Sequence, residues 1–153
     1  MHVAVLLGGR SLEREVSLVT GRHCARALEE AGYSTVCIDA RDDDLPGQLR
    51  KAAPDVVFNA LHGRFGEDGC IQGLLETLNL SYTHSGVLAS ALAMNKVMTK
   101  QIYRQHGLPT PGDRTIDTPD EINQCDVSRP CVVKPIDEGS SVGVVLIRET
   151  AEQ

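Results

Sequence analysis

Short apolar runs alternate with amphipathic segments along the first sixty residues. The first apolar run has the composition of a central strand buried on both faces of a parallel sheet, and two further runs are typical of strands. Between them, apolar side chains recur at helical spacing, and Gly32 and Pro54 stand where the two helices should end. This alternation predicts an α/β domain with a parallel, Rossmann-like sheet. The expected strands are 3–7, 35–40 and 56–60, and the expected helices are 12–31 and 45–52.

The hydrophobic pattern changes in the last third of the chain. The elements expected before that point are helices 71–78, 87–94 and 96–106 and a short strand, 81–83. The segment 108–112 contains two prolines and is typical of an extended link. Beyond it, the apolar runs 131–135 and 142–147 flank a loop rich in Ser and Gly, which predicts a hairpin rather than another strand-helix unit.

The composition narrows the class of protein. The chain carries 15 Lys and Arg against 21 Asp and Glu, a net charge of −6, which argues against nucleic-acid binding. No apolar run approaches the ~18 residues that a membrane helix needs, and the first residues lack a basic signal-peptide region. Five cysteines without a Cys-x-x-Cys pair indicate buried, unreactive thiols in a reducing compartment. We therefore expect a cytoplasmic protein without nucleic-acid or membrane partners.

The turn from Gly8 to Glu15 is the first candidate for chemistry. It follows a strand and opens a helix that Ser11 can cap, and backbone N–H groups at such a place can hold an anion. Position alone favours Glu13 as an acid that complements the helix dipole. A functional Glu13 would instead hold a substrate ammonium group.

A second glycine-rich turn runs from His62 to Gly69. It lies at the carboxyl end of a predicted strand, where α/β sheets bind ligands. His62 is equally compatible with a structural and a functional role. For Glu67 and Asp68 we favour a structural role, as caps of the helix that follows.

Three lysines are the remaining candidates. Lys96 and Lys100 are one helical turn apart, and by themselves they predict only a solvated pair. Lys134 differs because it ends a strand and precedes the Ser/Gly loop 138–143. A lysine beside loop N–H and hydroxyl donors can cover a polyphosphate. An ordinary mobile hairpin tip is the alternative.

Taken in order along the chain, these clusters resemble one family, the D-alanine–D-alanine ligases, which are ATP-grasp enzymes. The resemblance runs from residue 3 to residue 147, and the stretch from His62 to Gly73 is its most specific part. The matching stretches are Leu7-Gly8-Gly9-x-Ser11-x-Glu13-Arg14-Glu15-Val16-Ser17, Ala60-Leu61-His62-Gly63 through Gln72-Gly73, Tyr82-Thr83-x-Ser85-Gly86-Val87, Asn95-Lys96, and Lys134-Pro135 with Glu138-Gly139-Ser140-Ser141-Val142-Gly143.

The resemblance implies a domain over residues 1–93 that holds the first D-alanine, followed over 94–153 by the beginning of an ATP-grasp α+β domain. It also implies roles for single residues. Glu13 would bind the ammonium of the first D-alanine, His62 would lie beside that substrate, and Ser140 would join Glu13 in a hydrogen-bond network that closes the loop. The other implied substrate-binding residues are Val16, Ser17 and Gly63, and those for the ATP phosphates are Lys96, Lys134, Ser140, Ser141 and Gly143.

The family reaction, a step of peptidoglycan synthesis, forms an acyl phosphate on one D-alanine, which the amine of a second then attacks. It uses ATP with Mg²⁺ or Mn²⁺, whose acidic ligands we expect in a carboxyl-terminal half that is missing here. Family members are much longer, so we expect a truncated ligase that is inactive alone, with a homodimer as its assembly. D-serine or D-lactate stays open as second substrate. His84 stands where the family usually has glycine, which restricts that turn.

Two other hypotheses remain open on the sequence. The chain is alternatively a non-catalytic interaction or dimerisation fragment, with apolar surface near Val16, Val19 and the helix 71–78. A nicotinamide-binding domain is a weaker alternative, because no Gly-x-Gly-x-x-Gly follows the first strand.

Overall fold

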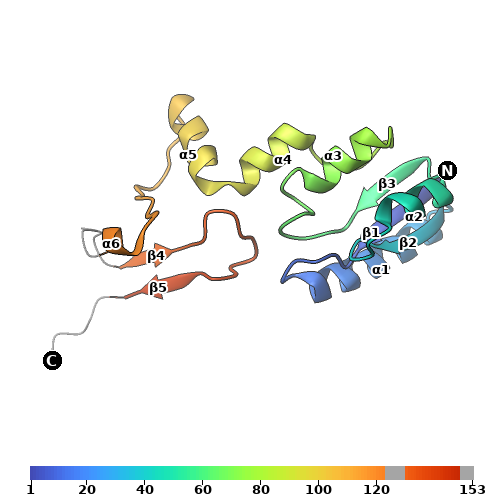
Figure 1. Cartoon of the computed structure of the whole chain (residues 1–153), viewed down its shortest axis with the longest axis horizontal. Helices are drawn as coiled ribbons and strands as arrows, with labels where there is room; N and C mark the ends of the chain where they lie inside the picture. Colours follow the sequence, from blue (N-terminus) through green and yellow to red (C-terminus); the bar gives the residue numbers. More distant parts are fainter. Residues whose placement is uncertain (123–129, 149–153) are drawn as a thin grey trace.

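The computed structural model describes residues 1–122 and 130–148. Figure 1 shows an elongated arrangement, with a parallel sheet and its helices at one end, a two-stranded sheet at the other, and α4 and α5 between them. The elements are β1 (His2–Leu7), α1 (Arg14–Glu30), β2 (Ser34–Asp39), α2 (Leu45–Ala52), β3 (Val56–Asn59), α3 (Cys70–Thr77), α4 (Val87–Met94), α5 (Lys96–Gln105), α6 (Pro119–Ile122), β4 (Cys131–Val133) and β5 (Val145–Ile147).

The sheet at the amino-terminal end confirms the predicted α/β class. β1 lies in the middle, with β2 along one side and β3 along the other, and both pairings are parallel. All three carboxyl ends therefore meet at one edge of the sheet, which is the edge where α/β folds place their ligands.

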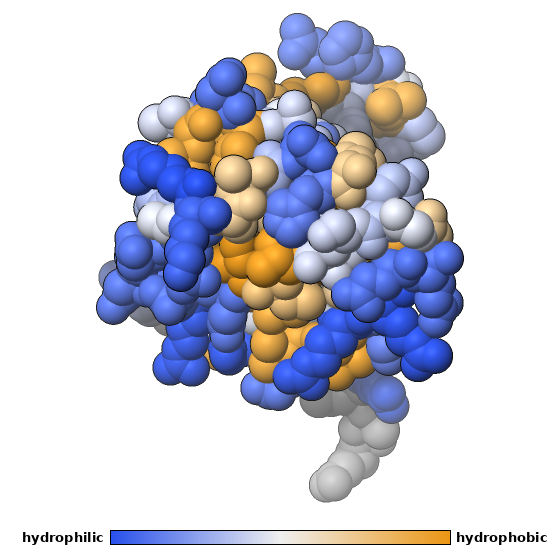
Figure 2. Space-filling model, turned by 90° about the vertical axis from the view of Figure 1, so that its right-hand side faces the viewer, coloured by the Kyte–Doolittle hydropathy of each residue, from blue (hydrophilic) through white to orange (hydrophobic). Residues whose placement is uncertain are grey.

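Helices cover both faces of this sheet. Val3 and Val5 pack with Ala25 of α1 on one face. Ala4 and Leu6, which alternate with them along β1, pack with α2 and α3 on the other face. All four β1 side chains are at most 2% exposed, so a strand that is apolar at every position here marks helices on both sides. Seen from this end of the molecule, polar and charged side chains flank an apolar strip on the surface (Figure 2).

The predicted hairpin is present at the opposite end. β4 and β5 are antiparallel, with Val132 opposite Leu146. β5 begins at Val145 rather than at residue 142, because residues 139–144 close two turns through backbone hydrogen bonds. Leu146 is 64% exposed, so the apolar pattern of this hairpin is left largely uncovered.

Residues 81–83 are shorter than the strand expected there. Tyr82 forms a single parallel bridge to Val57, so the segment lies beside β3 without extending the sheet as a full strand. His84, which follows this segment, has a positive φ of 91°, a value that glycine adopts more easily. Its ring packs edge-on against Phe58, with the centroids 6.3 Å apart. The sequence also did not predict α6, a single turn of four residues.

One surface proposed for a partner is not available. The apolar face of α3 is buried in the core, with Ile71 at 5% exposure and Leu75 at 0%. It was misread because an amphipathic helix has the same spacing whether it covers its own sheet or a partner. Val16 and Val19 of α1, by contrast, are 55% and 52% exposed.

The expectation of buried thiols is also wrong. Cys37 and Cys70 are exposed, Cys24 and Cys131 are half-buried, and all four are free. Cys37 alternates with the buried Ile38 along an outer strand, so its side chain lies on the opposite face of the sheet from Ile38. The fifth thiol, at position 125, lies outside the described residues. Over residues 1–122 and 130–148, no helix is both long and apolar enough to cross a membrane.

Candidate functional site

Two loops meet at the carboxyl edge of the parallel sheet, one after β1 and one after β3. The Ser11 hydroxyl donates to the His62 carbonyl over 2.7 Å and accepts the N–H of Glu13 over 3.2 Å. α1 starts only at Arg14, with Glu13 as the residue before it. Ser11 thus links the two loops rather than capping the helix, and the two glycine-rich turns form one region.

Glu13 is the acid at the centre of this region. Its Oε1 is buried and has no hydrogen-bond partner among the residues that the structure describes. A Cβ built on Gly63 or on Gly139 would lie 3.0 Å from that oxygen. The loop after β3 and the loop of the hairpin therefore both come close to it. A buried carboxylate oxygen without a donor is unfavourable by itself, and an ammonium group is a donor of matching charge.

Hydrogen bonds hold the turn at His62 and Gly63 in place. Gly63 N–H donates to the Glu67 carboxylate over 2.6 Å. The His62 Nε2 lies 3.3 Å from the Thr20 hydroxyl of α1. The expectation that Glu67 caps α3 is therefore wrong, because its carboxylate reaches back to the turn before it.

Asp68 does hold the start of α3, as expected. It accepts the N–H groups of Phe65 and Cys70 over 2.9 and 3.1 Å. Burial raises the pKa of Asp68, but these hydrogen bonds outweigh it and leave the pKa below its ordinary value.

Burial and the neighbouring Asp68 raise the pKa of the Cys70 thiol, and burial also raises the pKa of the Cys37 thiol. Neither thiol is thus activated as a nucleophile.

Two residues of α1 named as substrate contacts have different surroundings. Ser17 is fully buried, and its hydroxyl donates to the Ala60 carbonyl over 2.7 Å. This bond joins α1 to the end of β3. Val16 is exposed on the same helix, so it is open to a ligand or to another chain.

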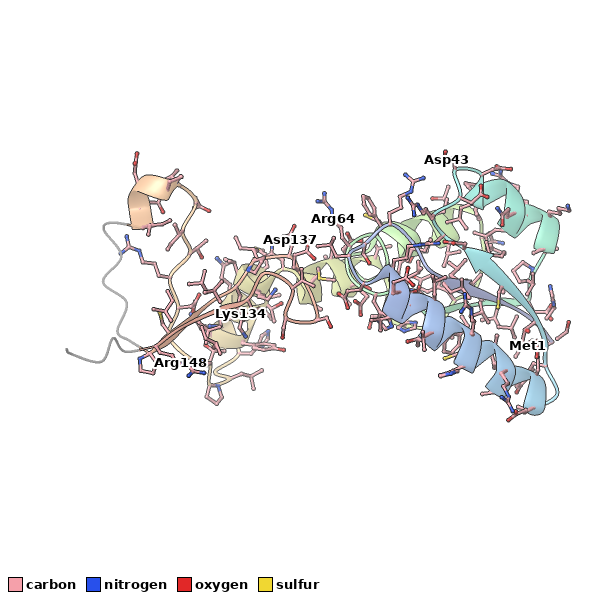
Figure 3. The ribbon with its side chains drawn as sticks, turned by 90° about the horizontal axis from the view of Figure 1, so that it is seen from below. Met1, Asp43, Arg64, Lys134, Asp137 and Arg148 are labelled. Atoms are coloured by element: carbon pink, nitrogen blue, oxygen red, sulfur yellow. The ribbon has the colours of Figure 1, made fainter. Side chains whose placement is uncertain are left out.

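The loop of the hairpin points from the far end of the molecule toward this region (Figures 1 and 3). Ser140, Ser141 and Gly143 all have positive φ angles, of 49°, 62° and 67°, which is uncommon for serine. Ser140 is exposed and does not form the expected hydrogen bond to Glu13 Oε1. The neighbouring Gly139 approaches that oxygen instead.

The lysines expected to contact phosphate differ in their partners. The Nζ of Lys96 donates to the carbonyls of Glu138 and Ile136 over 2.6 and 3.4 Å, which ties the loop to the start of α5. Lys134 is exposed directly after β4 and forms no hydrogen bond or ion pair within the part of the chain that is described. Figure 3 shows it near the base of the loop. Lys100 pairs with Asp113 at 3.2 Å.

An ion pair next to Glu13 was not predicted from the sequence. The Arg14 guanidinium donates to both carboxylate oxygens of Asp39, over 2.8 and 2.6 Å, and to the Gly9 carbonyl over 3.0 Å. The hydrogen bonds from Arg14 hold the pKa of Asp39 well below its usual value, and Asp39 in turn raises the pKa of Arg14. The sequence signal that could have revealed this pair was Asp39, an acid at the end of the second strand.

That same position holds the ribose-binding acid in dinucleotide folds. In this chain the Asp39 carboxylate also accepts the N–H groups of Gly9 and Arg41, over 3.2 and 3.0 Å. With its oxygens engaged by Arg14 and by these two backbone groups, Asp39 is not free for a ribose hydroxyl. The geometry therefore argues against the nicotinamide alternative.

A cavity of ≈ 240 Å³ opens at the same edge, on the side of α2 and α3. Ser11 and His62 line it together with apolar side chains such as Leu45 and Leu74, whereas Glu13 and Ser140 do not. Among the residues that the structure describes, no group of three His, Cys, Asp or Glu side chains could hold a metal ion.

Sequence comparisons point to one family. A family model described as "D-ala D-ala ligase N-terminus" matches residues 41–85. The D-alanine–D-alanine ligase of Ruegeria pomeroyi is 58% identical over 150 residues, which are 97% of this chain and 48% of the relative. That of Parvibaculum lavamentivorans is 55% identical over 147 residues, 96% of this chain and 47% of the relative. The chain spans about half the length of the curated relatives it matches.

Solved structures agree with this assignment. The D-alanine–D-alanine ligase of Bacillus anthracis superposes with a TM-score of 0.77 at 34% identity, covering 98% of this chain and 50% of that one. The same enzyme complexed with ATP superposes with a TM-score of 0.77 at 33% identity, covering 97% and 50%. By sequence and by fold, the chain matches the amino-terminal half of the D-alanine–D-alanine ligases.

Proposed function

We propose that the region around Glu13 binds the first D-alanine of an ATP-dependent D-alanine–D-alanine ligase. The observation that carries this proposal is the buried Oε1 of Glu13, without a partner, at the place where Gly63 and Gly139 approach it. An amino acid brings an ammonium group, which supplies both the missing donor and the opposite charge. His62, next to Gly63, and Val16, one helical turn after Glu13, would border the substrate.

The ATP phosphates would lie under the hairpin loop. Among the described residues, the Lys134 ammonium beside that loop has no partner. Lys96 uses two of its three N–H donors on loop carbonyls, so that one remains for a phosphate oxygen. Ser140, Ser141 and Gly143 would cover the phosphates. ATP supplies a phosphoryl group that makes the D-alanine carboxylate reactive toward an amine. The residues of this chain would position the two substrates and neutralise phosphate charge.

A Mg²⁺ site is not formed by the described residues, because no cluster of acidic or His side chains gathers there and Mg²⁺ requires oxygen ligands. The metal would be held by the part of the ligase that this chain does not span. The same proposal includes a second D-alanine as acceptor, a cytoplasmic homodimer, a role in peptidoglycan synthesis, and a domain division between residues 93 and 94.

The proposal is tested by restoring the other half of the ligase. The 153-residue chain alone should release no phosphate from ATP in response to D-alanine. Joined to the carboxyl-terminal half of the Ruegeria pomeroyi ligase, it should form ADP in the presence of D-alanine. Glu13→Gln should then raise the KM for D-alanine at least tenfold, and Lys134→Ala should raise the KM for ATP.

Two surface variants serve as controls. Glu15→Gln repeats the Glu13 change at an exposed position, and Lys51→Ala removes an exposed lysine of α2. Both should leave the two KM values within about twofold, since exposed charges contribute little. The proposal fails if Glu13→Gln behaves like Glu15→Gln in an active hybrid.

A non-catalytic interaction fragment is the second candidate. It is favoured by the exposed apolar side chains of the hairpin and of α1. Leu12, Val16 and Val19 are 79%, 55% and 52% exposed, at spacings of four and three residues. Sedimentation of the chain as a dimer that binds neither D-alanine nor ATP by calorimetry supports this candidate, whereas a monomer argues against it.

A further inference from the structure

The isolation of the Glu13 carboxylate is unexpected for a residue with arginines so near in the sequence. Arg10 precedes it by three positions and Arg14 follows it directly, yet Glu13 Oε1 is buried and finds no partner within residues 1–122 and 130–148. Among the described residues, both arginines pair with other acids instead.

Two acids pair with these arginines, one at the end of β2 and one in the turn after it. Asp39 takes Arg14 in a two-bond pair whose side chains are 37% and 25% exposed. Asp43 takes Arg10 at 2.6 Å in a pair that is far more exposed, at 98% and 53%. Solvent screens the second pair much more than the first. Asp39 therefore holds its arginine more strongly than Asp43 does.

The turn before Glu13 is shaped around the Asp39–Arg14 pair. Gly8 has a φ of 72°, and a Cβ added there would lie 2.5 Å from Asp39 Oδ1 and 2.6 Å from the Arg14 Nη1. The pair also binds both backbone groups of Gly9, through its N–H and its carbonyl. The Arg14 side chain is thus fixed against the turn, on the side of β2.

We propose that Asp39 is a positioning residue for the ligand site, because it holds the Arg14 guanidinium and so leaves the Glu13 carboxylate free for an ammonium group. This inference rests on the proposed function. When Asp39 is removed, the released Arg14 should compete with the ligand for Glu13. A purely structural role of Asp39 does not predict this competition. Removing Arg14 as well should then restore ligand binding.

The experiment is a D-alanine titration of the 153-residue chain by calorimetry. Asp39→Asn should weaken D-alanine binding about tenfold, which is one unit on a logarithmic scale of affinity. The double variant Arg14→Gln/Asp39→Asn should recover most of that loss. Asp43→Asn, the matched control at the exposed pair, should stay within about twofold of the unmodified chain. A double variant that binds as weakly as Asp39→Asn, or more weakly, overturns the inference.

A second measurement needs no ligand. The NMR signal of the Arg14 Nε–Hε group should shift on adding Glu13→Gln in the Asp39→Asn background, because the released guanidinium then contacts Glu13. The same change should leave this signal unmoved when Asp39 is present. If the unmodified chain binds no D-alanine, the proposed function fails for this chain, and the NMR comparison still decides the inference. A signal that ignores Glu13→Gln in both backgrounds overturns it.

Discussion

The two sheets of this chain differ in what covers them. β1 is apolar throughout, and α1 on one face with α2 and α3 on the other bury its side chains almost completely. β4 and β5 are just as apolar, yet Val132, Val145 and Leu146 are 48%, 55% and 64% exposed. Within the described residues, no comparable layer of helices lies over the hairpin.

This difference shows that apolar strands bury their side chains only where other layers cover them. A two-stranded sheet is marginal by itself, and its unpaired edges can accept another strand. The parallel sheet has a core packed on both faces, whereas most apolar side chains of the hairpin are exposed.

The largest expected effect comes from a matched pair of truncations. Leu6→Ala, at a site with 0% exposure, should lower the free energy of unfolding by about 2–5 kcal/mol, because it leaves a cavity between packed layers. Leu146→Ala, at 64% exposure, should change it by less than about 0.5 kcal/mol. Urea unfolding followed by circular dichroism measures both. Equal losses would contradict the contrast between the two sheets.

A smaller effect is expected where α1 lies against β1. A Cβ added to Gly21 would lie 2.4 Å from the Leu7 Cβ, so Gly21→Ala should cost about 1–3 kcal/mol through overpacking. Gly112→Ala is the control, because nothing lies within 4 Å of its added Cβ. It should leave the midpoint of thermal unfolding unchanged or slightly raised. A midpoint unaffected by Gly21→Ala would mean that the helix is not closely packed on the sheet.

The smallest effect concerns acid stability. The folded state lowers the pKa of Asp39, so its contribution is complete above the unfolded pKa of about 3.9 and is lost as the pH falls through the lower folded value. Because the pair is partly exposed, the loss should be about 1 kcal/mol or less. Unfolding measured between about pH 5 and pH 2 should show a flatter acid dependence in Asp39→Asn. An unchanged slope would indicate that the pair adds no stability.

The sequence predicted most of the elements because their signals are local. Continuous apolar runs indicated β1, β2 and β3, and helical spacing indicated the helices between them. Where the local signal was short, the prediction was less accurate: residues 81–83 form only a bridge, and α6 was not expected. The glycine-rich turns were also found from the sequence, because their composition is unusual in itself.

Which side chains meet was decided only by the tertiary structure. Glu13, Gly63 and Gly139 lie on three separate loops, and their approach depends on how the sheet and the hairpin pack. The Arg14–Asp39 pair joins residues 25 positions apart that become neighbours only because β1 and β2 are parallel and adjacent. Burial, which leaves Glu13 Oε1 without a partner, is likewise a property of packing. The local spacing of apolar residues determines helices, strands and turns. Contacts between distant residues form only when the folded chain buries apolar surface away from water.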